Sequence, residues 1–233
     1  PTDGTVRGRG VFRLIESPEA EARAAALFAA ELGVATVGVI APDDEVGMAT
    51  VAAFAGAATA AGIAVTAQGH YAADRTTLER DVKTFLGLDP ATNRRLAAHL
   101  RRHGRRAWQT FSPDVPFALL YVPDRYDRAA LVASFLPYLG VEVHSEDFPD
   151  LEALARKHGG RLPQVVQLLG SAGWNHPSVI TRGGPAVEGA LVLVPCPLEQ
   201  GEATAFVDDF RARRRRDPSP AAAAAHDAWR LVA

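Results

Sequence analysis

The chain has 233 residues, of which 48% are hydrophobic and 22% are charged, and its formal net charge is −2. This composition excludes a disordered chain and provides apolar surface for one large domain or two smaller lobes. The small net charge disfavours nucleic acid and anionic membranes as partners, and no apolar run is long and hydrophobic enough to insert into a bilayer. The single cysteine, Cys196, excludes an intrachain disulfide.

Helices and strands alternate along the chain after an extended lead-in segment at 1–14. Ser17-Pro18-Glu19 predicts a helix start, because it combines a Ser cap, Pro at the first helical position and an acid near the positive helix end. This helix is expected to end at Gly33, and the β-branched run at 34–41 predicts a strand covered on both faces. The same patterns predict, in chain order, a helix ending near 62, a strand at 63–71, helices at 76–86 and 91–108, a strand at 117–122, a helix at 128–138, strands at 165–169 and 190–194, and helices at 202–215 and 221–233.

The stretch at 141–160 is ambiguous: its sequence allows a short strand and then a helix that ends at Gly159-Gly160. The five apolar strands, each followed by helical sequence, predict an α/β fold. We expect a doubly wound, mostly parallel five-stranded sheet with helices on both faces. In such sheets ligands bind beyond the carboxyl ends of the strands, so the turns that follow the strands are the candidate site.

The turn Gly170-Ser171-Ala172-Gly173-Trp174-Asn175 follows a buried strand and is rich in small residues. Its hydroxyl, its exposed amides and its aromatic ring suit non-covalent recognition of a small molecule. Alternatively, it is a tight turn whose Trp174 packs against the neighbouring helix. The Gly-x-Ser-x-Gly spacing of a hydrolase nucleophile is absent.

Two further turns follow predicted strands. Asp43-Asp44-Glu45 either caps the next helix, which we favour, or forms an acidic rim for a polar ligand. In Asp124-Arg125-Tyr126-Asp127, Arg125 could clamp a carboxylate and Tyr126 could stack, or an Asp could cap a helix beside a solvated Arg125. The predicted ligand-binding residues are Asp43, Asp44, Asp124, Arg125, Tyr126, Ser171, Ala172, Trp174 and Asn175.

No catalytic, cofactor or metal site is predicted. His99 and His103 have the i, i+4 spacing of a helical metal pair, but six arginines between 94 and 106 surround them and disfavour a cation. No nucleophile is paired with a base, and no Gly-rich phosphate loop is present. Aromatic residues that would stack on bases do not alternate with the arginines, so nucleic acid is not an expected partner.

Several segments together resemble a known family, the type 1 periplasmic binding proteins, in the branched-chain amino-acid receptor group. The most similar branch is LppC-like, whose members include lipoprotein activators of penicillin-binding proteins. The segments that carry this resemblance are Val11-Phe12-Arg13-Leu14 with Ser17-Pro18, the strand at 34–41 with its acidic turn to Gly47, Tyr71 with Thr76-Thr77-Leu78, the run at 117–124, the run at 168–175, the run at 187–192 and Ala225-His226-Asp227-Ala228.

The resemblance implies a two-lobed protein that closes on its ligand like a hinged trap. Residues 12–195 would form the second lobe, 1–11 a crossover segment, and 196–233 helices that return toward a first lobe encoded before Pro1. It also implies a periplasmic location or a lipid anchor at the cell envelope. Two positions depart from the family: Val46 replaces an aromatic residue, and Ala172 replaces the acid that binds a ligand ammonium group. A leucine-type ligand is therefore disfavoured.

The expected function is that of a non-enzymatic, extracytoplasmic receptor that binds a small polar molecule by hinge closure and partners an ABC permease. The alternative is an LppC-like module that regulates a penicillin-binding protein by direct contact. The Arg-rich helix at 91–108 and the region 141–162 are then the candidate interfaces, since both extend the minimal sheet.

Overall fold

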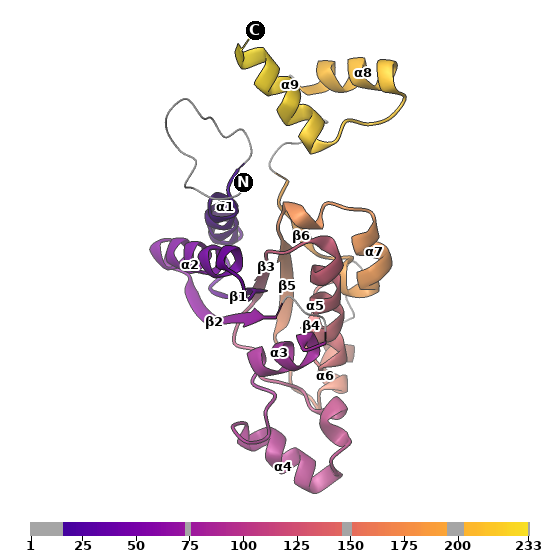
Figure 1. Ribbon diagram of the computed structural model, residues 1–233. Coiled ribbons are helices and arrows are strands. Elements are labelled where there is room, and N and C mark those ends of the chain that lie inside the picture. Colours follow the sequence, from indigo (N-terminus) through magenta and orange to yellow (C-terminus); the bar gives the residue numbers. More distant parts are fainter. Residues whose placement is uncertain (1–15, 73–75, 146–150, 195–202, 233) are drawn as a thin grey trace. The chain divides into compact units, whose positions relative to one another are not determined.

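The structure, a computed structural model, describes residues 16–72, 76–145, 151–194 and 203–232 (Figure 1). It divides into two compact units, Glu19–Leu193 and a smaller unit that comprises Pro1–Pro18 with Val194–Ala233. In the smaller unit the two predicted helices are confirmed as α8 (Ala203–Arg214) and α9 (Pro220–Val232). The lead-in segment at 1–14 and Cys196 lie outside the described residues.

The larger unit contains the predicted parallel sheet. Every strand pair is parallel, and the order is β2-β1-β3-β5-β4, with β6 also paired to β5. The sheet has six strands rather than the five predicted, because the ambiguous stretch supplies the short strand β4. The strands are β1 (Thr36–Pro42), β2 (Ala64–Tyr71), β3 (Leu119–Val122), β4 (Glu142–Val143), β5 (Val165–Gly170) and β6 (Leu191–Val192).

The helices of this unit follow the predicted order, with short additional elements between β5 and β6. The sequence analysis did not predict α7 or the 3-10 turn η4, because each is too short to show an apolar period. The helices and 3-10 turns are α1 (Pro18–Glu31), α2 (Glu45–Ala60), α3 (Leu78–Phe85), α4 (Arg94–His103), η2 (Ala107–Thr110), α5 (Tyr126–Tyr138), α6 (Leu151–Lys157), η3 (Ala172–Trp174), α7 (Ser178–Gly183) and η4 (Gly184–Val187).

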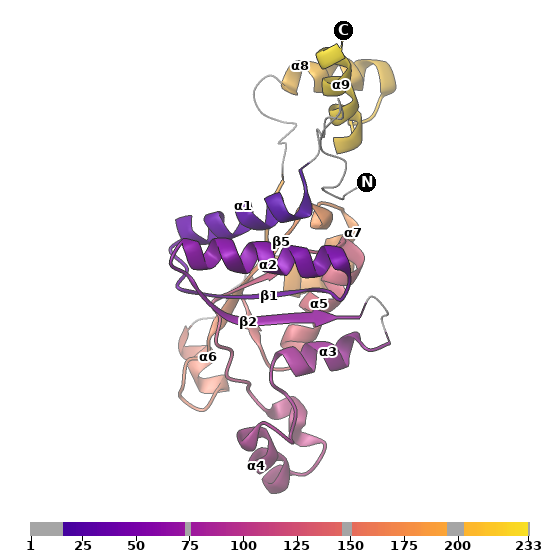
Figure 2. The same ribbon diagram turned by 60° about the vertical axis from the view of Figure 1, so that its left-hand side comes forward.

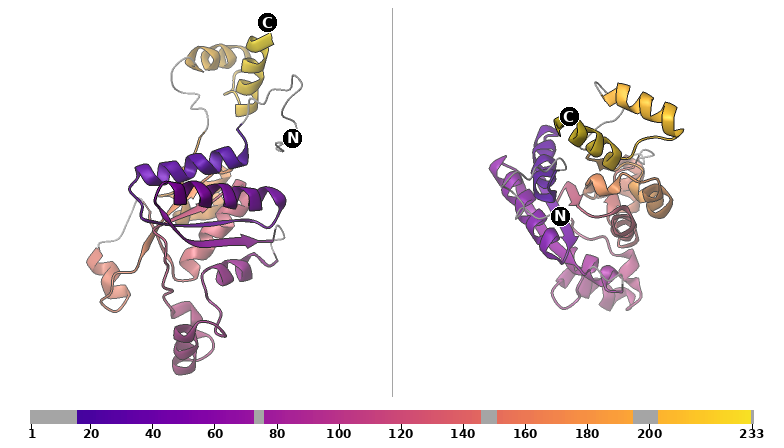
Figure 3. Two further views of the ribbon diagram at one scale, coloured as in Figure 1. Left: turned by 90° about the vertical axis from the view of Figure 1, so that its left-hand side faces the viewer. Right: turned by 45° about the horizontal axis from the view of Figure 1, so that its top comes forward.

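Two apolar cores cover the two faces of the sheet, as expected for a doubly wound fold. On one face α1 and α2 lie side by side across the strands (Figures 2 and 3), and the α1 alanines that face the sheet are fully buried. Small side chains let this helix approach the sheet closely. On the other face α3 and α5 pack against β1, β3 and β5. The central strands are therefore buried on both sides, and their carboxyl ends are held rigidly.

Tyr121 on β3 provides a test of the core beneath α2. Its ring stacks on Phe54 with a centroid distance of 4.8 Å, but its buried hydroxyl has no hydrogen-bond partner among the described residues. Burial raises the pKa of Tyr121 well above its usual range, and nearby Glu21 raises it further. We expect Tyr121→Phe to raise the free energy of unfolding by about 1 kcal/mol, because it removes an unpaired polar group.

Tyr71→Phe is the matched control, measured in the same urea titrations. The Tyr71 hydroxyl is also buried, but it donates a 2.5 Å hydrogen bond to Asp124. Its removal should lower the free energy of unfolding by roughly 1.5–3 kcal/mol. A loss of stability in Tyr121→Phe would show that the Tyr121 hydroxyl has a partner in solution.

Candidate functional site

The carboxyl ends of the central strands form the switch point of the sheet. The chain leaves β1 to form β2 on one side of it, whereas β3 pairs with β1 on the other side. Ligands of open α/β sheets bind at this point, because the diverging loops leave a crevice there. The turns after β1, β3 and β5 all lie at this edge, and they contain the nine predicted residues.

Asp124, directly after β3, is the centre of a buried polar network. Its carboxylate accepts hydrogen bonds from Nε and Nη2 of Arg128, both at 2.7 Å, and from the Tyr71 hydroxyl. It also accepts the backbone amide of Arg125 at 2.6 Å. Because both carboxylate oxygens already have donors, Asp124 is a positioning residue in this structure rather than the ligand contact that was expected.

The network fixes two protonation states. The hydrogen bonds to Asp124 raise the pKa of Arg128, so this guanidinium keeps its charge. Burial raises the pKa of Tyr71 far above its usual range, and Asp124 raises it further, so the phenol keeps its proton and donates. Arg128 is only partly buried and directs a bidentate pair inward, which holds the first turn of α5 at the site edge.

Trp174 belongs to the core beneath the turn rather than to an exposed wall. Its side chain is 1% exposed, and its indole N–H donates to the carbonyl oxygen of Val122 at 2.9 Å. Ser171 is also buried, and its hydroxyl donates to the carbonyl oxygen of Asp124. The structure therefore agrees with the alternative interpretation, in which Trp174 packs inside a tight turn. Through their hydrogen bonds, the side chains of Ser171 and Trp174 join the turn after β5 to the end of β3 and the turn that follows it.

Glycine is required where these two turns touch. A Cβ added at Gly173 would lie 2.5 Å from the carbonyl oxygen of Asp124, which is a backbone atom that cannot move aside easily. The backbone amide of Ala172, one residue before Gly173, donates a hydrogen bond to the carboxylate of Glu21 on α1. The amide that was expected to meet a ligand thus has a protein partner.

The acidic turn after β1 has a structural role that the sequence predicted. Asp44 is the N-cap of α2 and accepts the amide of Gly47 at 2.7 Å, which confirms the favoured capping interpretation. Asp43 is exposed, and its backbone amide donates to the carbonyl oxygen of Tyr71. Asp44 and Glu45 are exposed as well, but the Asp44 side chain is engaged by the cap, so Asp43 is the predicted binding acid of this turn that has no capping role.

The remaining predicted residues provide the exposed rim of the edge. Arg125 is exposed and pairs with Asp127 at 3.3 Å. Tyr126 stacks on His176, with ring centroids 3.9 Å apart and planes 10° apart, which joins the start of α5 to the turn after β5. Asn175 is exposed beside His176. These side chains could contact a polar molecule without rearrangement of the core.

Four residues of this edge were not predicted: Glu21, Tyr71, Arg128 and His176. Arg128 follows Asp124 by four residues within a helical sequence, and this spacing is a signal that could have identified the pair. The other three meet their partners only through the tertiary fold. No local pattern marks them.

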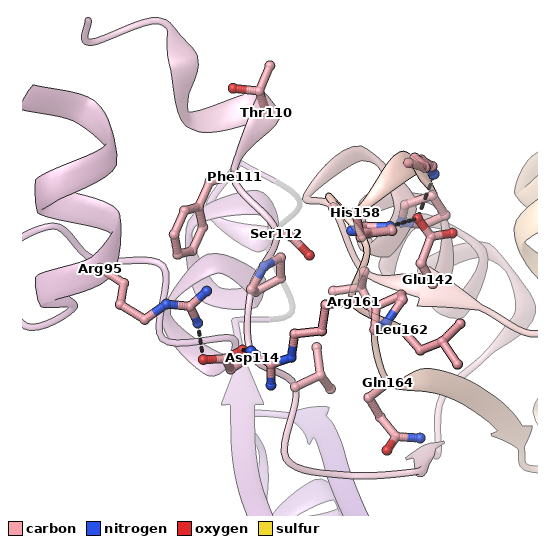
Figure 4. Close-up of a pocket in the computed structure, with 17 residues that line it drawn as sticks. Arg95, Thr110, Phe111, Ser112, Asp114, Glu142, His158, Arg161, Leu162 and Gln164 are labelled. Atoms are coloured by element: carbon pink, nitrogen blue, oxygen red, sulfur yellow. Dashed lines mark hydrogen bonds and ion pairs between the residues drawn. The ribbon is translucent and has the colours of Figure 1, made fainter. Parts of the chain in front are cut away.

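A hollow of about 600 Å³ lies at the opposite edge, among the segments that precede β3, β4 and β5 (Figure 4). Arg95 and Arg161 approach Asp114 from two sides, the latter at 3.7 Å. Glu142 accepts hydrogen bonds from Lys157 at 2.5 Å and His158 at 2.7 Å. Burial alone would raise the pKa of Glu142, but these two bonds lower it, so the carboxylate stays ionised.

The described residues contain no cluster of three or more His, Cys, Asp or Glu side chains arranged to hold a metal ion. The rings of His99 and His103 are tilted by 40° with centroids 4.7 Å apart, and His99 Nε2 lies 3.0 Å from the carbonyl oxygen of Ala107. Among the helices of the described ranges, none combines the length and the hydropathy needed to cross a bilayer.

Comparison with known proteins identifies solved structures that share this fold. No protein-family model and no curated protein matches the chain. Three solved structures align well: a leucine binding protein from Thermotoga maritima (TM-score 0.58, 20% identity, 97% of this chain and 51% of that chain), an ABC transporter substrate-binding protein from Desulfitobacterium hafniense (0.59, 20%, 95% and 50%), and such a protein from the same organism in complex with Leu (0.57, 20%, 94% and 49%).

The chain spans about half the length of the solved structures it matches. Two of the three are substrate-binding proteins of ABC transporters, and the third is a leucine binding protein. The expected fold is thereby confirmed: the chain has the fold of one lobe of a type 1 periplasmic binding protein.

Proposed function

We propose that this chain is the second lobe of an extracytoplasmic receptor that binds a small polar molecule by hinge closure. Residues 12–195 would form the lobe, and 196–233 would return toward the first lobe. The observation that carries the proposal is the convergence of three strand-end turns at the switch point of the sheet. A receptor of this kind performs no chemistry on its ligand, and it would deliver the ligand to an ABC permease at the cell envelope.

At this edge of the sheet, buried residues fix the turns and other residues remain available to a ligand, and this arrangement supports the proposal. Asp124, Ser171 and Trp174 lie below the surface and fix the turns, and Asp44 fixes the start of α2. The predicted residues left at the surface are Asp43, Arg125 and Asn175, which are exposed, and Tyr126 and Ala172, which are half-buried. This arrangement is preorganised, since a buried layer holds an exposed polar rim, and preorganisation lowers the entropic cost of binding.

The rim also narrows the ligand class. Arg125 is the exposed cation among the predicted residues, and Tyr126 with His176 forms a flat stacked pair beside it. A carboxylate could pair with Arg125, and a planar or apolar group could lie on the stacked rings. Where amino-acid receptors of this group have an acid for the ligand ammonium, this chain has Ala172, so we expect a carboxylate without a buried ammonium.

A thermal-shift screen of the full-length protein tests this function. The panel contains amino acids, short peptides, aliphatic and aromatic carboxylates, sugars and cell-wall fragments. A ligand that binds the folded protein stabilises it by about 2.7 kcal/mol at a hundredfold excess over Kd. We expect a saturable shift with a carboxylate that Arg125→Ala and Asn175→Ala abolish.

Arg102→Ala, an exposed arginine at the other edge of the sheet, is the control and should keep the shift. No shift with any compound of the panel would contradict the receptor function. A shift that survives both rim variants would contradict the proposed site.

A second candidate function is the LppC-like one, a module that regulates a peptidoglycan synthase by protein contact. The observation that favours it is the meeting of the two predicted interface regions, 91–108 and 141–162, around the hollow before β3. Co-precipitation with a penicillin-binding protein would test it. Binding that is unaffected when Arg101, Arg102, Arg105 and Arg106 are reversed in charge would exclude α4 as the contact.

A further inference from the structure

The helix α4 and the turn after it present an uncompensated basic surface. Residues 87–106 contain six arginines and one acid, Asp89. Leu96 is buried and fixes the inner face of α4, so the arginine face points away from the core. Of the six arginines, Arg95 pairs with Asp114. The others are exposed and have no ion-pair partner among the described residues: Arg94, Arg101, Arg102, Arg105 and Arg106.

Three hollows along α4 share Arg95 as a lining residue, and we call them together the trough. The largest, of about 600 Å³, lies between η2 and the loop before β5 (Figure 4). A second, of about 340 Å³, shares Thr110 and Phe111 with it and continues along the helix to Arg102. A third, of about 450 Å³, lies at the start of α4 beside Asn93. A trough of this kind suits an extended ligand better than a compact one.

The walls of the trough are chemically mixed. Phe111 is buried beneath Arg95, whose guanidinium lies 5.6 Å from the ring centroid. Leu162 is 52% exposed at the wall beside Arg161 (Figure 4). Asp114, between two arginines, and Glu142, between Lys157 and His158, add fixed negative charges. An occupant must therefore pair with arginines, contact an apolar wall and avoid two carboxylates.

We propose that this trough binds an extended acidic segment of a partner protein, with carboxylates on the α4 arginines and an apolar side chain against Leu162. A peptide can alternate acidic and apolar residues to match such walls. A nucleic-acid strand cannot, because its phosphates carry one negative charge about every 3.4 Å and would meet Asp114 and Glu142. Phe111 is too buried to stack on bases, and the imidazole rings of His99 and His103, which also line the trough, pack against each other.

This proposal does not depend on the small-ligand function, because it concerns the other edge of the sheet. It gives the docking alternative a site and a partner chemistry. Fluorescence anisotropy on the full-length protein tests it with four labelled probes: a short peptide of alternating Glu and Leu, an all-Glu peptide, the first peptide with Lys in place of Glu, and a single-stranded oligonucleotide of equal charge. The thermal-shift screen reports separately on the cleft.

We expect the alternating peptide to bind most tightly and the Lys peptide not to bind. The double variant Arg94→Glu/Arg102→Glu changes two arginines that line the hollows and should weaken binding about tenfold or more, because two attractions become repulsions. The double variant Arg23→Glu/Arg182→Glu makes the same change of net charge at exposed positions outside the trough and should bind as the native protein does. Leu162→Ser should weaken binding of the alternating peptide, which has apolar side chains, but should leave binding of the all-Glu peptide unchanged.

Three outcomes would overturn the proposal. Failure of both acidic peptides to bind excludes the trough as an acidic-peptide site. An equal loss of peptide affinity in the two double variants would show that the acidic peptides are attracted non-specifically by the net charge of the protein. Tighter binding of the oligonucleotide than of the alternating peptide identifies a nucleic-acid surface instead. Circular dichroism of each variant shows that loss of binding is not loss of fold.

Discussion

Replacing Trp174 with alanine is expected to lower the free energy of unfolding by about 3–5 kcal/mol. The side chain is the largest that is fully buried, and its removal leaves a cavity between α5 and the turn after β5. It also leaves the carbonyl oxygen of Val122 without its donor. Because the indole ring packs directly against the backbone of Gly170, the turn around it should also lose its fixed conformation.

Urea unfolding of Trp174→Ala and Trp229→Ala measures this effect. Trp229 on α9 is 71% exposed, so its removal should change the free energy of unfolding by less than about 0.5 kcal/mol. Trp174→Phe keeps an aromatic ring but loses the N–H donor, and we expect an intermediate loss. Similar small losses in both alanine variants would show that Trp174 is at the surface, as an aromatic wall of the cleft requires.

The sequence was sufficient for the central layer of this fold. β1, β3 and β5 are buried largely on both faces, so each appears as a short run rich in apolar residues, which Gln167 interrupts in β5. β4 and β6 contain two residues each; the apolar run at 190–194 predicted a strand where β6 lies, whereas the sequence around β4 was ambiguous. They exist because β5 offers an unpaired edge: β4 pairs with its first residues and β6 with its last. Such strands depend on tertiary context.

The same distinction applies to the site. The Asp44 cap is a contact across three residues, and local sequence predicted it. The Tyr71–Asp124 bond joins residues 53 apart in sequence, and the Glu21–Ala172 contact joins residues 151 apart. No pattern within one segment can identify such partners. Sequence reasoning located the turns at the carboxyl ends of the strands, but it assigned ligand contact to three side chains that are buried in the fold: Asp124, Ser171 and Trp174.

Replacement of Asp124 by alanine is the second large effect that we expect. Asp124 is the shared acceptor of Arg128 and Tyr71, so its loss leaves a charged group and a buried phenol without a partner. Removal of one member of a buried ion pair costs about 3–5 kcal/mol. Because the side chain of Arg128 is 26% exposed and can recover some hydration, we expect a loss of about 2–4 kcal/mol here.

Asp43→Ala is the matched control, since it removes a carboxylate one strand away that is exposed to solvent. It should change the free energy of unfolding by less than about 0.5 kcal/mol, and we expect it to weaken ligand binding at the rim. The pair of variants thus separates the two roles within one edge. A buried acid that holds the turns should lower stability when removed, and an exposed acid should affect binding alone. An Asp124→Ala variant as stable as the native protein would contradict the network and leave Asp124 free to contact ligand, as the sequence first indicated.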